Sequence, residues 1–139
     1  MPKSMMIAFL VTDLVFLLYW LISGLALLGV LNIPPDWMYA DYDKADVVAW
    51  NWSFLPVDLG FSALGLMAVS AARRGAAVWR PLALVSMTFT MAAGGMAISY
   101  WALLGEFDPS WFFPNLALVI WPLFFLPPLI RSMGSQQAA

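Results

Sequence analysis

Four long apolar stretches leave few folds open to this chain. They run from about 5–31, 47–72, 81–104 and 110–130, and each can form a membrane-spanning helix, which needs about 20 apolar residues. Backbone groups in lipid must hydrogen-bond within the protein, so spanning segments are either helices or the strands of a closed barrel. None of the four stretches alternates with the period of two that barrel strands show. We therefore predict an all-α integral membrane protein.

The composition and the short connections support one membrane domain. The chain has 139 residues, of which 63% are hydrophobic and 10% charged, whereas a soluble domain carries about 25% charged residues. A core of this size cannot bury so much apolar surface, so lipid must cover the remainder. Short connections place consecutive helices antiparallel. We predict a single domain over residues 1–139, folded as an antiparallel four-helix bundle.

The basic residues are distributed unevenly around the four stretches. Five of the six lie before the first stretch, between the second and third, or after the fourth. These five are Lys3, Arg73, Arg74, Arg80 and Arg131. Cytoplasmic segments of membrane proteins are enriched in Lys and Arg. We therefore expect both termini to be cytoplasmic, with the protein in the cell membrane.

Several kinds of chemistry are excluded by the residue types that the chain lacks. It contains no Cys and no His, which excludes a disulfide, a His-ligated haem and a Ser-His-Asp triad. No complete catalytic motif remains, so an enzyme is the least favoured class, and we expect no metal site and no cofactor. The net charge of -2 provides no basic surface for nucleic acid, and we expect no nucleic-acid partner.

Two acidic residues lie inside the predicted spans. Asp13 is in the first stretch and Asp58 is in the second, and no Lys or Arg lies within a span to neutralise them. A charge at the bilayer centre costs about 2.5–3.5 kcal/mol on insertion scales, and intramembrane acids usually face the bundle interior and mark a site. A purely structural role, in which hydrogen bonds from these acids tie helices together, is also open.

Polar and aromatic residues accompany the two acids. Asn51 lies seven residues before Asp58, on the same helical face, and Pro56 leaves the carbonyl of Trp52 without its usual helical partner. Trp20, Trp50 or Trp52 can offer rings for stacking or cation–π contacts. The predicted ligand-binding residues are Asp13, Trp20, Asn51, Trp52 and Asp58.

Small residues recur at a spacing of four in the third stretch. Ala93 with Ala97, and Gly95 with Ser99, form small-xxx-small pairs, which let helix backbones approach closely. Packing within the chain is one interpretation of these pairs, and a homodimer face is the other.

Two segments resemble the YvaD-like family of small bacterial membrane proteins. They contain Thr12-Asp13 with Tyr19-Trp20 in the first stretch, and the run 49–58 in the second. The resemblance covers most of the chain, including the long first loop. Because that family is functionally uncharacterised, the resemblance implies a bacterial membrane protein and no activity.

Two further families share the outline of four spans. Asp13 resembles the acid in the first helix of small multidrug resistance transporters, but the strong charge bias, the long first loop and Asp58 depart from that family. Asp13 and Asp58 also resemble, in general position only, the cavity acids of emopamil-binding and sigma-2-receptor-like proteins. The isomerase chemistry of that group is not implied, because no matching His or Glu is present.

Three functions follow from these features. The first is binding of a small hydrophobic, cationic or lipid-like ligand in an intrabundle cavity near Asp13 and Asp58. The alternatives are an accessory or assembly subunit of a larger membrane complex and a proton-coupled small-molecule transporter. The expected partners are the lipid bilayer, such a ligand, and a second copy or other subunits of a complex.

Overall fold

The computed structural model describes residues 1–34, 37, 39 and 41–137. Within these residues the regular elements are helices and no strand is present, which confirms the predicted all-α fold. The helices are α1 (Lys3–Leu27), α2 (Ala45–Ser53), α3 (Leu55–Arg73), α4 (Trp79–Leu104) and α5 (Pro109–Gln137).

Four helical segments are long and apolar enough to cross a bilayer. They are Lys3–Leu27, Ala45–Arg73, Trp79–Leu104 and Pro109–Gly134, and α2 and α3 together form the second. The four predicted helical stretches are thereby confirmed, and their length and composition are compatible with a small membrane protein.

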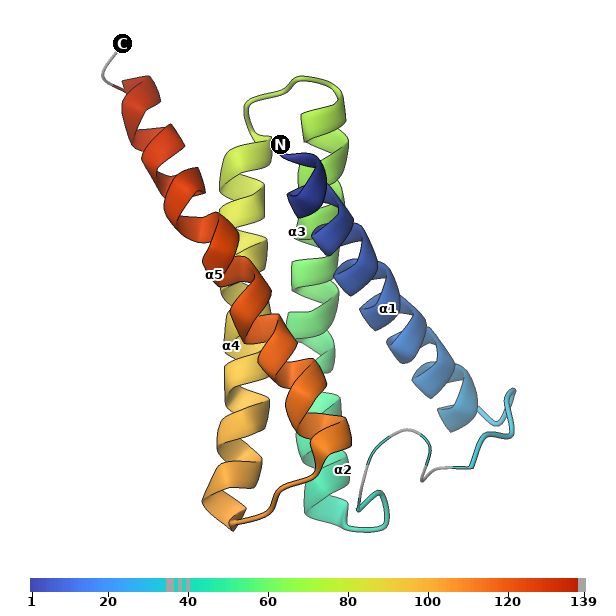
Figure 1. Ribbon diagram of the computed structural model, residues 1–139. Helices are drawn as coiled ribbons and strands as arrows, with labels where there is room; N and C mark the ends of the chain where they lie inside the picture. The colour runs from blue at the N-terminus through green and yellow to red at the C-terminus, as the bar shows by residue number, and fades with distance from the viewer. Residues whose placement is uncertain (35–36, 38, 40, 138–139) are drawn as a thin grey trace.

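The four spans run antiparallel (Figure 1). Helix α3 packs against both α1 and α4, and α4 also packs against α5. Helices α1 and α5 make far fewer contacts with each other. Both chain ends lie at the same end of the bundle as the α3–α4 connection, which we call the basic end. The opposite end, which holds the segment before α2 and the α4–α5 connection, is called the acidic end.

Local sequence signals explain where the helices begin and end. The first helix ends at Leu27, four residues before the predicted limit, because Gly29 adopts a positive φ of 71° that reverses the chain. At the start of α5 the Asp108 carboxylate accepts hydrogen bonds from the backbone N–H and the hydroxyl of Ser110, at 2.8 and 2.7 Å. Pro109 then occupies the first helical position, where its missing N–H costs nothing.

The second span is broken at Phe54, between α2 and α3. Pro56 has no N–H to offer the carbonyl of Trp52, so the regular ladder cannot continue through this point. The Phe54 N–H instead donates to the carbonyl of Asn51 at 3.1 Å, and the Asp58 N–H donates to the carbonyl of Phe54 at 2.9 Å. The irregular stretch lies where Pro56 predicts it, between Asn51 and Asp58.

The fifth helix continues beyond its predicted limit at residue 130. It contains Pro114, Pro122, Pro127 and Pro128 and still reaches Gln137. Leu129 is buried in the core, so tertiary packing holds the segment that follows the two adjacent prolines. Pro127 and Pro128 therefore do not end this helix, although two adjacent prolines usually would.

The apolar core lies toward the basic end. It contains Met5, Phe9, Ala68, Val69, Ala83, Met87 and Leu129. The rings of Phe9 on α1 and Trp121 on α5 meet edge to face, with their centroids 5.3 Å apart. This contact joins α1 to α5 near the basic end, whereas a cavity separates the two helices closer to the acidic end.

Candidate functional site

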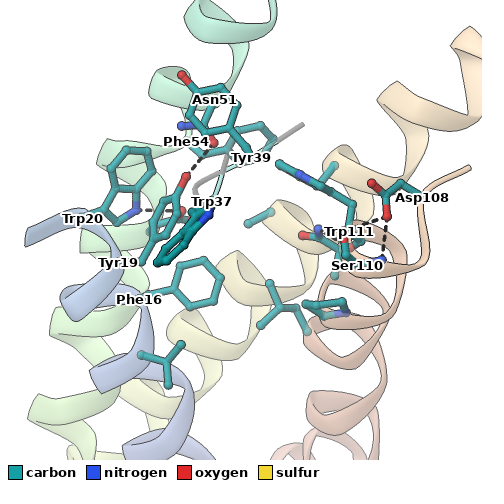
Figure 2. A pocket seen from close by; sticks show the side chains of 17 residues that line it. Phe16, Tyr19, Trp20, Trp37, Tyr39, Asn51, Phe54, Asp108, Ser110 and Trp111 are labelled. Carbon is teal, nitrogen blue, oxygen red and sulfur yellow. Dashed lines mark hydrogen bonds between the residues drawn. The ribbon is translucent and has the colours of Figure 1, made fainter. Parts of the chain in front are cut away.

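A cavity of about 470 Å³ opens among the helices on the acidic side of the Phe9–Trp121 contact. All four spans and the first loop contribute side chains to it (Figure 2). Its lining residues are Val15, Phe16, Tyr19, Trp20, Trp37, Tyr39, Asn51, Phe54, Asp58, Ala93, Ala97, Asp108, Ser110, Trp111, Pro114, Asn115 and Leu118. The volume lies in the range of small-molecule sites, about 300–1,000 Å³.

Aromatic side chains from α1 and α5 form two of the cavity walls. Figure 2 shows Phe16, Tyr19 and Trp20 of α1 on one side, with Ser110 and Trp111 of α5 across the space. Aromatic rings with a few polar groups among them are typical of pockets that bind small organic molecules.

The Asp58 carboxylate is a buried polar group of the cavity wall. It comes from the first turn of α3, immediately after the helix break, and is 4% exposed. One oxygen accepts a hydrogen bond from the indole N–H of Trp20 at 3.0 Å. The other oxygen, Oδ1, has no hydrogen-bond partner among the described residues. One oxygen of this buried carboxylate is therefore unpaired within the described residues.

Asn51 supplies a second incompletely used polar group. The phenol of Tyr19 donates to its side-chain oxygen at 3.0 Å. Its side-chain Nδ2 group is buried and makes no hydrogen bond within the described part of the chain. Two adjacent residues of α1 thus hold the polar side chains in place: Tyr19 binds Asn51, and Trp20 binds Asp58. Asn51 and Asp58 each retain one unpaired polar atom among the described residues.

The electrostatics of the lining favour a cation. Asp58 and Asp108 both line the cavity, and no Lys or Arg is found among its described lining residues. Hydrogen bonds from Ser110 hold the pKa of the Asp108 carboxyl group below its usual value, so this group is ionised at neutral pH. Over the described ranges, no three His, Cys, Asp or Glu side chains are grouped to hold a metal ion.

Three of the five predicted ligand-binding residues come together at the cavity. Trp20, Asn51 and Asp58 line it, whereas Trp52 and Asp13 do not. The Trp52 ring instead packs against the Trp20 ring, with a centroid distance of 5.4 Å. Trp52 therefore supports a wall of the cavity from behind.

Asp13 lies outside the cavity, between α1 and α3. Its side chain is fully buried, and neither carboxyl oxygen has a hydrogen-bond partner in the described structure. It is in contact with the Gly65 position of α3, next to Phe9. The hydroxyl of Ser62, one turn before Gly65, is likewise buried and unpaired among the described atoms. The sequence placed Asp13 and Asp58 in one site, and the structure separates them.

No residue of α5 was among the five predicted ligand-binding residues. Asp108, Trp111 and Asn115 all line the cavity, and they recur at the spacing of three and four that places residues on one helical face. This pattern in the sequence could have indicated a polar and aromatic face on the last span. Nothing in the sequence indicated that this face meets α1 across a cavity.

The two small-residue pairs of α4 have different surroundings. Ala93 and Ala97 are buried and line the cavity, so packing within the chain accounts for them. Gly95 and Ser99 lie on another face, where a Cβ at Gly95 would meet nothing within 4 Å. A homodimer face at this second pair stays a prediction.

The chain matches the model of a protein family described as "Family of unknown function (DUF5360)" over residues 5–136. The chain belongs to this family. A relative from Bacillus subtilis (strain 168), "Uncharacterized protein YvaD", is 39% identical over 129 residues, which cover 93% of each chain. The predicted resemblance to YvaD-like proteins is thus confirmed. No solved structure matches the chain.

Proposed function

We propose that this protein binds a small hydrophobic cation in the cavity, with the positive group beside Asp58. The observation that carries the proposal is the free Oδ1 atom of a buried carboxylate at an aromatic-lined cavity. A buried carboxylate without a positive partner is costly in an apolar surrounding. A cationic ligand removes that cost when it binds, so the energy of its pairing with the Asp58 carboxylate contributes to the binding affinity.

The neighbouring rings suit the same ligand. Tyr19, Trp20 and Trp111 line the cavity, and a desolvated cation over an aromatic face gains about 0.5–2 kcal/mol per contact. An ammonium group that carries apolar substituents would fill the space and meet both the rings and Asp58. Asp108 adds a second negative charge that attracts such a cation.

The test compares a cation with its uncharged isostere. Benzyltrimethylammonium and neopentylbenzene have the same shape and differ in the central atom and its charge. We expect purified protein to bind the cation at least about tenfold more tightly, equivalent to 1.4 kcal/mol, by isothermal titration calorimetry. Asp58→Asn should abolish this preference. Equal binding of the two probes by the native protein would overturn the proposal.

The matched control for Asp58→Asn is Asp46→Asn. Asp46 is exposed in the first turn of α2 and is not among the residues that line the cavity. Both substitutions remove one acidic group from the second span. Only the substitution at Asp58 should reduce binding of the cation, and thermal unfolding of both variants shows whether each still folds.

We also propose that both termini face the cytoplasm of a bacterium, with the protein in the inner membrane. Lys3, Arg73 and Arg80 lie at or near the basic end, and cytoplasmic segments are enriched in such residues. Since the chain has no Cys, single cysteines give a clean test. A membrane-impermeant maleimide should label Asp43→Cys in intact cells, and Ala77→Cys only after permeabilisation. The reverse pattern would show the opposite orientation.

A further inference from the structure

The cavity has a side opening between α1 and α5. Val15 on α1 and Pro114 on α5 both line the cavity, and both are also exposed on the bundle surface; Val15 is 57% exposed. Val15 lies twelve residues before the last residue of α1, which corresponds to about 18 Å along the helix. The opening is therefore inside the span, where lipid acyl chains surround the protein.

The opening follows from how α1 and α5 pack. The two helices meet through Phe9 and Trp121 near the basic end and have few contacts elsewhere. In the view of Figure 1, α3 and α4 lie behind α1 and α5, and no other helix lies across the face between these two. A chain-like group that leaves between α1 and α5 thus reaches the bilayer without displacing another helix.

Polar and apolar groups are separated along the cavity lining. The group that can pair with a cationic head is the Asp58 carboxylate, which α1 positions through Trp20. The lining residues exposed between α1 and α5, Val15 and Pro114, are apolar. A molecule with a cationic head and a hydrocarbon tail matches this distribution, since its tail exchanges lipid contacts for similar apolar contacts.

We infer that the ligand is a single-chain cationic amphiphile, whose head lies at Asp58 and whose alkyl tail leaves between α1 and α5 into the membrane. This inference rests on the proposed function and narrows its ligand class. The cavity holds the head and the first part of the tail, and the bilayer holds the remainder. The length of the tail is then not limited by the volume of the cavity.

The test uses butyl- and dodecyltrimethylammonium with full-length protein in lipid nanodiscs, with binding to empty nanodiscs subtracted. Val15→Trp places a bulky ring in the opening. We expect it to weaken dodecyl binding at least about tenfold more than it weakens butyl binding, because only the long tail must pass the opening. Pro114→Phe narrows the same opening from α5 and should give the same selective loss.

Val11→Trp is the matched control. Val11 lies one turn earlier on α1 and is 60% exposed, but it does not line the cavity. This variant should change neither affinity. If Val15→Trp and Pro114→Phe both leave dodecyl binding unchanged while butyl binding still depends on Asp58, the tail exit is wrong and the cation site stands. If the native protein binds butyltrimethylammonium without dependence on Asp58, the proposed function itself fails.

Discussion

The carboxyl group of Asp13 on α1 lies directly against Gly65 on α3, with no space for a side chain between them. A Cβ atom built at Gly65 would collide with the Asp13 carboxyl group and would lie 2.8 Å from the ring of Phe9. Since an atom at that distance from an aromatic ring must displace it, Gly65 sets how closely α1 and α3 approach.

The first prediction is that Gly65→Ala destabilises the protein. The added methyl group must push α1 away from α3 or force Asp13 out of its position, which costs about 1–3 kcal/mol by the usual penalty for overpacking. The measurement is the free energy of unfolding, from a denaturing-detergent titration followed by circular dichroism.

Gly60→Ala is the control for this prediction, because it makes the same change in the same helix. A Cβ at Gly60 would meet nothing within 4 Å, and alanine favours helix by about 0.5–1 kcal/mol over glycine. Gly60→Ala should therefore be neutral or stabilising. Equal unfolding free energies for the two variants would show that Asp13 and Gly65 are not in tight contact.

The second prediction concerns the contact between α4 and α5 beside the cavity. A Cβ at Gly94 would lie 2.6 Å from the backbone oxygen of Asn115 and 2.8 Å from the Cβ of Leu118. Backbone cannot move aside as a flexible side chain can, so Gly94→Ala should lower the free energy of unfolding by about 1–3 kcal/mol.

The next residue provides the control for Gly94. Gly95 belongs to the same helix and has open space at its Cβ position, so Gly95→Ala should leave the unfolding free energy unchanged or raise it slightly.

A dimer that uses the Gly95–Ser99 face would lose affinity in this variant, which analytical ultracentrifugation in detergent can detect.

Particular residues show how far the sequence predicts this structure. Apolar length and Pro56 are local signals, and they correctly predicted four spans and an irregular stretch in the second one. The end of α5 was mispredicted, because the contacts of Leu129, which hold the helix beyond Pro127 and Pro128, come from residues far away in the chain. Gly29 was an available local signal for the end of α1.

The candidate site was predictable only in part for the same reason. Burial cost singled out Asp58, and helical spacing added Asn51, without any knowledge of the other helices. Whether Asp13 joins them depends on how α1 crosses α3, and the close approach at Gly65 keeps Asp13 away from the cavity. Periodicity within one helix carries no information about that crossing.

The third prediction concerns the pH dependence at the start of α5. Hydrogen bonds from Ser110 lower the pKa of Asp108 in the folded state below the value of 3.8 expected for an unperturbed carboxyl group. A lowered folded pKa stabilises the fold above the unperturbed value, and this stability is lost as the pH falls through the folded pKa. Ser110→Ala removes the hydroxyl bond and should raise the pKa of Asp108.

The measurement is an NMR titration of the Asp108 side-chain carbon. The control is Ser53→Ala, since the Ser53 hydroxyl is also exposed but donates to the carbonyl of Trp50. It should leave the Asp108 titration unchanged. An Asp108 pKa that is the same with and without the Ser110 hydroxyl would show that this hydrogen bond does not stabilise the helix start.

The fourth prediction is that Asp13→Val stabilises the protein. The Asp13 side chain is fully buried and its oxygens have no hydrogen-bond partner among the described residues. A buried polar group without a partner costs about 1–3 kcal/mol, and valine has a similar size without that cost. The free energy of unfolding should therefore rise by an amount of this order, while Asp46→Val, at an exposed position, should change it little.

The direction of the Asp13→Val effect separates the two roles that the sequence left open for this acid. A structural role, in which Asp13 ties helices together by hydrogen bonds, requires valine to destabilise the fold, because those bonds would be lost. A rise in stability means that the fold carries Asp13 at a cost, and stability alone then does not explain its presence. Binding of benzyltrimethylammonium should be unchanged in the variant, since Asp13 lies outside the cavity lining.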